Sequence, residues 1–261
     1  MNQSEGGAAG SRFGVLGVPV NAIQIPDAIA QMSRWIETRD ATRYVAVTGM
    51  HGISESRLDP AFRQVLAGAG MVVPDGMPLV WLARAHGYSL RRRVYGPELM
   101  LEFCRTTASR ALRHYFYGGA PGVAEALGDH LSKRFPGVVV AGSHCPPFRA
   151  LTKEEDDDVV ARINASNPDI VWVGLSTPKQ ERWMHAHRHR LHVPVMVGVG
   201  AAFDMHTGRV RQAPRWMQEH GLEWCYRLVQ EPRRLWWRYV VLGSMFVGNV
   251  SLELAGLRKF D

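Results

Sequence analysis

The sequence predicts an α/β fold in which a mostly parallel sheet is covered by helices on both faces. Short apolar runs alternate with amphipathic stretches as far as Gly200, and the links between them are short. The chain has 261 residues, of which 46% are hydrophobic, and this is enough for one large domain or two small ones.

Six runs have the length and the β-branched or apolar composition of buried strands. The most hydrophobic of them reads PDIVWVGL, at 168–175. The expected strands are 43–48, 70–74, 113–119, 138–142, 168–175 and 194–200.

Five stretches between these runs are expected to be helices. One of them carries Leu58, Phe62, Val65 and Leu66 at helical spacing, and two others begin with the proline that favours a first helical turn. The expected helices are 54–69, 77–87, 121–135, 156–166 and 178–191.

The composition changes after Gly200. Residues 209–238 hold seven arginines against three glutamates, together with four tryptophans. Asn249 and Glu253 interrupt the apolar run at 239–257, so we do not expect a membrane span there. We predict a disordered tail at 1–12, an α/β core at 13–204 and a basic, Trp-rich appendage at 205–261.

The overall charge and the cysteines indicate the kind of partner and the redox compartment of the protein. A net charge of +7 favours an anionic partner, whether a nucleotide, nucleic acid or a lipid surface. Cys104, Cys145 and Cys225 lie far apart without zinc spacing, which predicts a reducing compartment and no disulfide framework. The polar, Gly-rich N-terminus lacks the apolar centre of a secretory signal.

Small and polar residues follow five of the expected strands, where parallel α/β sheets bind their ligands. They are expected to form one site. These strand ends are residues 48–52, 75–76, 118–122, 176–181 and 201–204.

Several of these strand ends also have a purely structural interpretation. Thr48 and His51 are either an active-site pair or simply part of a loop. Asp75, in VVPDGMP, is either an N-cap of the next helix or a general base, and spacing alone favours the cap. Gln180 lies in TPKQ, which fits a capping box. The glycines at 118–122 suit a phosphate, although they do not match GxGxxG and also suit any tight turn.

Two other patterns are interpreted as solvated helix surfaces. The DDD at 156–158 contains the D-x-D of many metal-dependent sugar transferases, but it starts an amphipathic helix and no strand precedes it. Four histidines also lie close together without an HExxH or a cysteine, so a metal site is not expected. They are His185, His187, His189 and His192.

Several stretches together resemble the WecG/TagA/CpsF family of glycosyltransferases. They include VVPDGMPLVW, RRVYGPELM, VGLSTPKQERWM and QAPRWMQEHGLEWCYRLVQEPRR, and the likeness runs from about residue 13 to 241. The resemblance implies a Rossmann-like (GT-E type) core with a C-terminal appendage that helps the enzyme act at the membrane. It implies transfer of a sugar, with inversion, from a UDP-sugar to a polyprenyl-diphosphate-linked sugar in cell-surface polysaccharide biosynthesis, with no cofactor and no metal.

The resemblance also assigns roles to single residues. Asp75 matches the proposed general base, Thr48 a pocket residue beside it, and Arg93 an arginine suited to a diphosphate oxygen. Gln180 and Asp204 are expected near the nucleotide, and Gly119 is expected to approach the UDP. The appendage arginines expected to face lipid diphosphate or anionic headgroups are Arg215, Arg227, Arg233, Arg234 and Arg238.

One position departs from the family pattern. Many members have Asn where this chain has Met50, so the donor sugar is left open and His51 is expected to supply a replacement hydrogen bond. The expected location is cytoplasmic, on the inner face of the plasma membrane, and a homo-oligomer is compatible with the resemblance.

Two other classes of protein remain open. One is a UDP-sugar-binding protein without transferase activity. The other is a basic α/β protein that binds nucleic acid, although the arginines gather beside tryptophans and an apolar terminus rather than along a groove, so nucleic acid is not an expected partner. A dinucleotide oxidoreductase is less well supported, because the GxGxxG fingerprint is missing from the sequence.

Overall fold

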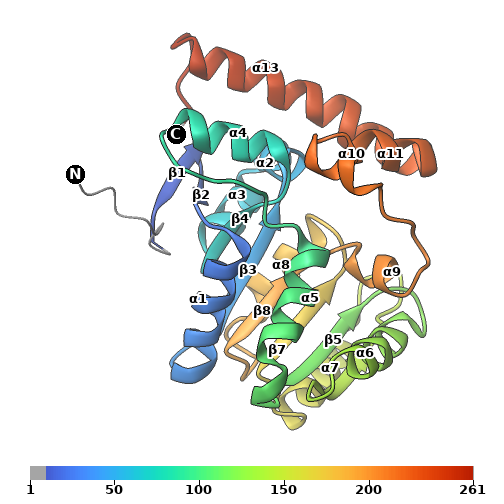
Figure 1. Ribbon diagram of the computed structural model, residues 1–261. Coiled ribbons are helices and arrows are strands. Elements are labelled where there is room, and N and C mark those ends of the chain that lie inside the picture. The colour runs from blue at the N-terminus through green and yellow to red at the C-terminus, as the bar shows by residue number, and fades with distance from the viewer. Residues whose placement is uncertain (1–9, 261) are drawn as a thin grey trace. The chain divides into compact units, whose positions relative to one another are not determined.

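The computed structural model describes residues 10–260, and these form two compact units (Figure 1). Unit 1 contains the described part of Met1–Ala28, together with Val47–Tyr95 and the described part of Gln212–Asp261. Unit 2 contains Ile29–Ala46 and Gly96–Arg211. Most of the tail expected at 1–12 lies outside the described residues, and the first strand begins at Arg12.

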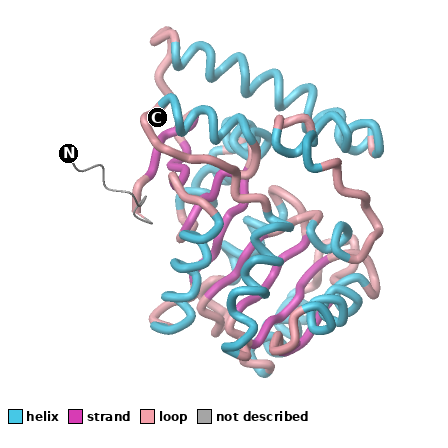
Figure 2. The backbone as a smooth tube through the Cα atoms, in the orientation of Figure 1, coloured by secondary structure: helices cyan, strands magenta, loops and turns pink. Residues whose placement is uncertain are grey.

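All six expected strands form one sheet, in the order β4-β3-β8-β7-β5-β6. The pairs β3–β8, β8–β7, β7–β5 and β5–β6 are parallel, and helices flank the sheet, so the predicted fold class is confirmed. The strands, magenta in Figure 2, are β3 (Arg43–Thr48), β4 (Met71–Pro74), β5 (Arg113–Gly118), β6 (Val139–His144), β7 (Ile170–Gly174) and β8 (Val195–Gly198).

The prediction of a single helix at 54–69 is wrong. The chain instead forms α2 (Met50–Leu58) and α3 (Pro60–Ala67). Asp59 separates them because its backbone is extended and its side chain accepts a hydrogen bond from Phe62 N at 3.1 Å, which caps the second helix.

The other expected helices form close to their predicted positions, and several further elements were not predicted. The expected ones are α4 (Met77–Ala85), α6 (Val123–Arg134), α7 (Lys153–Ala165) and α8 (Lys179–His187). The unpredicted ones are the hairpin β1 (Arg12–Val15) and β2 (Val18–Asn21), and α1 (Ile25–Thr38), α5 (Gly96–Thr107), η1 (Ala108–Arg110) and α9 (Ala202–His206).

The C-terminal segment is helical and belongs to unit 1. Its longest helix, α13, is red in Figure 1 and packs on α2, where Ser54 Oγ donates to the Leu242 carbonyl at 2.9 Å. No helix in residues 10–260 is long and apolar enough to cross a membrane. The elements are α10 (Arg215–Glu219), α11 (Glu223–Gln230), α12 (Pro232–Trp236), the π-helical η2 (Trp237–Val241) and α13 (Leu242–Leu254).

A buried amide ties the N-terminal hairpin to β4. Asn21, at the end of β2, is 1% exposed, and its side-chain oxygen accepts a hydrogen bond from Val72 N at 2.9 Å. The bond fixes the start of the strand whose other end carries Asp75. A buried peptide N–H without its acceptor is costly, so this side chain is important for the stability of unit 1.

We therefore expect Asn21→Ala to lower the free energy of unfolding by about 1–3 kcal/mol, because Val72 N–H loses its acceptor. Urea unfolding followed by circular dichroism would measure the loss. Gln64→Ala, which truncates an exposed amide on α3, is the matched control and should change stability little. Equal stability of the two variants would contradict the assignment.

Candidate active site

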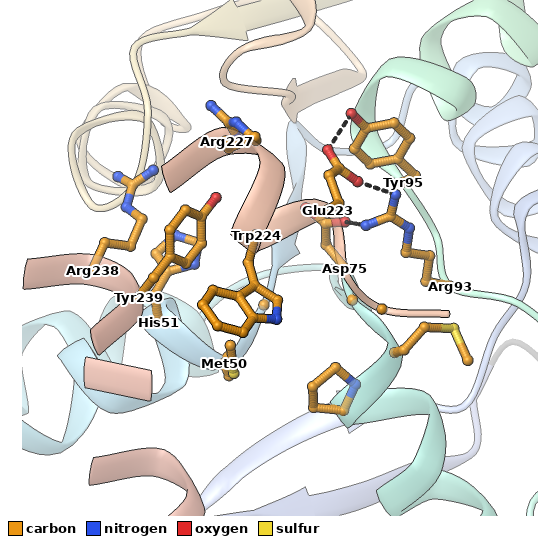
Figure 3. A pocket seen from close by; sticks show the side chains of 15 residues that line it. Met50, His51, Asp75, Arg93, Tyr95, Glu223, Trp224, Arg227, Arg238 and Tyr239 are labelled. Atoms are coloured by element: carbon orange, nitrogen blue, oxygen red, sulfur yellow. Dashed lines mark hydrogen bonds and ion pairs between the residues drawn. The ribbon is translucent and has the colours of Figure 1, made fainter. Parts of the chain in front are cut away.

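A pocket in unit 1 is built from three separate parts of the chain (Figure 3). They are the start of α2, the segment from the end of β4 to residue 95, and the C-terminal helices. The lining residues are Gly49, Met50, His51, Asp75, Gly76, Met77, Pro78, Arg93, Tyr95, Gly221, Glu223, Trp224, Arg227, Arg238 and Tyr239. The pocket thus brings together His51, Asp75, Arg93, Arg227 and Arg238 of the predicted residues.

The backbone around Asp75 turns its side chain into the pocket rather than onto a helix end. The N-cap of α4 is Gly76, at φ 124°, and no side chain caps this helix, so the capping interpretation of Asp75 is wrong. Asp75 N donates to the Thr48 carbonyl at 2.8 Å. A Cβ on Gly49 would lie 2.5 Å from the Asp75 carbonyl oxygen, so only glycine permits this close approach.

A single guanidinium lies between two carboxylates in the pocket (Figure 3). Arg93 is 3.9 Å from Asp75 Oδ1 through one nitrogen, and its other terminal nitrogen donates to Glu223 Oε2. Tyr95 Oη donates to Glu223 Oε1 at 2.7 Å, and the Tyr95 ring centroid lies 4.0 Å from the guanidinium carbon. Glu223 and Tyr95 were not predicted as site residues.

Burial makes Asp75 an unusually basic carboxylate. It raises the pKa of Asp75 from 3.8 to about 6, an effect that Arg93 opposes and Glu223 increases. The Asp75 side chain remains 28% exposed, so a ligand in the pocket can reach it. A carboxylate of this kind can accept a proton from a hydroxyl group near neutral pH.

The other wall of the pocket is basic and aromatic. His51, Arg227 and Arg238 line it together with Trp224 and Tyr239, whose rings lie 6.3 Å apart. Burial and the two arginines hold the pKa of His51 well below 6.5, so its imidazole is neutral at pH 7. Arg227 Nε is buried and has no hydrogen-bond partner among the described residues.

Comparison with known proteins identifies the family of this chain. The sequence profile of the glycosyl transferase WecG/TagA/CpsF family matches residues 13–259. This chain belongs to the WecG/TagA/CpsF family of glycosyl transferases. It is accordingly an enzyme of that class, as the sequence analysis predicted.

Individual WecG/TagA/CpsF relatives cover most of the chain. An N-acetylglucosaminyldiphosphoundecaprenol N-acetyl-beta-D-mannosaminyltransferase of Bacillus spizizenii is 33% identical over 196 residues, which is 75% of this chain and 74% of the relative. The protein of the same name from Bacillus subtilis is 30% identical over 202 residues, 77% of this chain and 76% of the relative. That of Staphylococcus aureus strain MW2 is 29% identical over 175 residues, 67% of each chain.

Four predicted residues of unit 1 do not line the pocket. Thr48 is fully buried, and its hydroxyl has no hydrogen-bond partner among the described residues. Arg233 is exposed on α12, and exposed Arg215 and Arg234 pair with Glu219 and Glu231 of their own local segments. The roles of these four residues stay predictions.

The position where the family often has Asn is apolar here. Met50 lines the pocket, and its Cε lies 3.8 Å from where a Cβ on Gly243 of α13 would sit. This thioether therefore packs toward α13, and His51 is the neighbouring group that can form a hydrogen bond in the pocket.

Gln180, in unit 2, is buried and holds the backbone of another loop. Pro178 is the N-cap of α8 and no side chain caps this helix, so the predicted capping box is wrong. Gln180 Oε1 instead accepts from Gly200 N at 2.9 Å, and Gln180 Nε2 donates to Glu181 Oε1 at 3.0 Å. The side chain thus connects α8 to the loop that follows β8.

Gly119 follows β5 and Asp204 lies on α9, after β8, and β7 separates these two strands in the sheet. Gly119 has φ 78°, and a Cβ there would lie 3.5 Å from Phe203, the residue before Asp204. Gly119 N donates to the Gly174 carbonyl at 3.1 Å, so this amide is not free to bind a phosphate. Asp204 forms an ion pair with Arg209 at 3.7 Å.

Several side chains of the two patterns interpreted as helix surfaces bond to other side chains of this protein. Asp156 is bound by Arg190 and by His187 Nε2, and Asp157 accepts from Arg190 at 2.6 Å. His185 Nδ1 lies 3.0 Å from Tyr44 Oη. Asp156, Asp157, His185 and His187 therefore have side-chain partners within unit 2. His187 is only 5% exposed, so the prediction of a solvated surface is wrong for this residue.

The raised pKa of Asp75 makes stability depend on pH. The folded protein binds its proton up to about pH 6, whereas the unfolded chain releases it near 3.8, so stability falls as pH rises through this window and then levels off. We expect Asp75→Asn to remove this fall, which is roughly 2–3 kcal/mol between pH 4 and pH 7.

Urea unfolding of both proteins at several pH values would measure this difference. Asp157→Asn, at an exposed position of α7, is the matched control for the loss of one carboxylate. Parallel pH profiles for wild type and Asp75→Asn would contradict a raised pKa at Asp75.

Proposed function

We propose that this protein moves a hexose or N-acetylhexosamine, with inversion, from a UDP-sugar to a sugar carried on polyprenyl diphosphate, in the synthesis of a cell-surface polysaccharide. The observation that supports this proposal most directly is the position of Asp75. This partly exposed, basic carboxylate lies at one wall of a pocket whose other wall holds Arg227 and Arg238. The relatives support the same class of acceptor, because their names specify N-acetylglucosaminyldiphosphoundecaprenol.

In this mechanism Asp75 is the general base. Its carboxylate accepts the proton of the acceptor hydroxyl while that oxygen forms a bond to the anomeric carbon of the donor. The bond between that carbon and the UDP oxygen breaks, and the electron pair leaves with UDP from the opposite face of the sugar. Asp75 ends protonated and returns its proton to solvent, which its exposed fraction allows.

The basic wall suits the diphosphate of the acceptor. Arg227 has an unpartnered buried Nε, and Arg238 lies on the same wall. Arg93 was expected to bind a diphosphate oxygen, but its guanidinium is engaged by Glu223 and lies near Asp75. We therefore assign diphosphate binding to Arg227 and Arg238, and assign to Arg93 an electrostatic effect on Asp75.

The α12 region supports action at the cytoplasmic membrane surface, where a polyprenyl acceptor resides. Trp236 and Trp237 are 57% and 59% exposed, and Arg233 and Arg234 lie beside them. Exposed tryptophans next to arginines suit the headgroup level of an anionic bilayer.

Replacing the base tests the reaction. We expect Asp75→Asn to lower sugar transfer by about 10²–10⁴-fold, because the amide cannot accept the proton. UDP release from a panel of UDP-sugars, with prenyl-diphosphate-linked N-acetylglucosamine as acceptor, would measure it and identify the donor. Asp157→Asn should keep wild-type turnover.

Two results would count against the proposal. Near-normal turnover in Asp75→Asn would remove Asp75 as the base. UDP binding without acceptor-dependent UDP release, for every donor tested, would favour a UDP-sugar-binding protein instead.

Replacing the exposed tryptophans tests membrane binding. We expect Trp236→Ser with Trp237→Ser to weaken binding to vesicles of mixed neutral and anionic phospholipid by about ten-fold or more, because two large apolar side chains no longer enter the interface. Vesicle co-sedimentation would measure this. Trp81→Ser, at a 50% exposed tryptophan on α4, is the control, and equal losses in both proteins would contradict a role specific to Trp236 and Trp237.

A further inference from the structure

We infer that Glu223 is a positioning residue for the reaction: it holds the Arg93 guanidinium away from Asp75, so that Asp75 remains free to act as the base. This inference rests on the proposed function. Glu223 begins α11, which is distant in sequence from both Asp75 and Arg93.

The contacts of Glu223 are stronger than those of Asp75. Its side chain is 8% exposed, and its two oxygens have separate donors, Arg93 at Oε2 and Tyr95 at Oε1. Arg93 approaches Asp75 only to 3.9 Å, which is an ion-pair distance and longer than a hydrogen bond. The guanidinium is therefore bonded to Glu223 and lies beside Asp75.

Tyr95 keeps this arrangement in place. Its hydroxyl donates to Glu223 at 2.7 Å while its ring lies against the Arg93 guanidinium, with 4.0 Å between the ring centroid and the guanidinium carbon. Burial and Glu223 raise the pKa of Tyr95 well above 10, so the hydroxyl stays protonated and remains a donor.

The chemical consequence follows from the charges around Asp75. The charges of Arg93, Glu223 and Arg227 shift the pKa of Asp75. Asp75 in turn raises the pKa values of Tyr95 and Tyr239. Without the negative charge of Glu223, Arg93 is free to close onto Asp75 with two parallel hydrogen bonds. Asp75 would then hold protons less strongly and be a weaker base for the acceptor hydroxyl.

Glu223→Gln tests the inference, because it removes the charge and keeps the shape of the side chain. In a plot of transfer rate against pH, we expect the acid limb to move to lower pH by roughly one unit. The plateau kcat should fall several-fold while KM for the acceptor changes little, since the variant affects the base and not the basic wall. Glu223→Asp, which restores the charge, should move the limb back toward wild type.

Asp157→Asn is the matched control. It removes one carboxylate charge at an exposed position of α7 that does not line the pocket, so it should leave the acid limb at the wild-type position. A limb that moves as far in Asp157→Asn as in Glu223→Gln would show that the charge of Glu223 has no specific effect on the base, and would overturn the inference.

A direct titration separates this inference from the proposed function. Carbon-13 NMR of the Asp75 carboxyl group, assigned by its loss in Asp75→Asn, follows the base in the free enzyme without any substrate. We expect its midpoint to lie lower in Glu223→Gln than in wild type. An unchanged midpoint in a folded variant would overturn the inference, even where wild type transfers sugar and Asp75→Asn does not.

Arg93→Gln covers the case in which Glu223→Gln does not fold, because it removes the cation and leaves the charge of Glu223. Asp75 should then titrate above the wild-type midpoint, because the nearest cation is gone. An unchanged midpoint would show that Arg93 does not act on Asp75 and would overturn the inference. If no UDP-sugar is transferred by wild type, the proposed function fails and the titration alone decides the role of Glu223.

Discussion

The candidate site depends on one guanidinium placed between two carboxylates. Asp75 and Glu223 would repel each other across a largely buried pocket, and Arg93 compensates both charges. The three residues come from the end of β4, from the segment after α4 and from the start of α11. The same contact therefore organises the base and joins distant parts of unit 1.

Basicity at Asp75 is obtained at the expense of stability. A carboxylate with a raised pKa is one that the fold disfavours in its charged form, and the backbone nevertheless holds it there. Two glycines make this possible, because Gly76 adopts φ 124° and Gly49 lets the Asp75 carbonyl come close. Backbone shape that only glycine accommodates is thus concentrated next to the proposed base.

The two walls of the pocket match the two ends of the proposed acceptor. In the proposed function, a sugar hydroxyl needs a proton acceptor, the role assigned to Asp75, and a diphosphate needs cations, the role assigned to Arg227 and Arg238. Trp224 and Tyr239 lie in the same pocket and offer ring faces to a sugar or the start of a prenyl chain. His51 is kept neutral beside the two arginines, so it can both donate and accept hydrogen bonds.

The sequence by itself determined the local secondary structure of this protein. The six strands and the helices α4, α6, α7 and α8 could be predicted, because apolar periodicity and strand composition act over a few residues. The rule that ligands bind at strand ends, together with the family resemblance, was enough to select Asp75, Arg93 and Arg227. Only the tertiary structure decided which groups surround these side chains. It showed that Asp75 is not a helix cap, and it placed Glu223 beside Arg93 and Tyr95, which lie 130 and 128 residues away in the chain. The physical reason is that a carboxylate's basicity is set by its burial and its neighbouring charges, and neither is a property of nearby sequence.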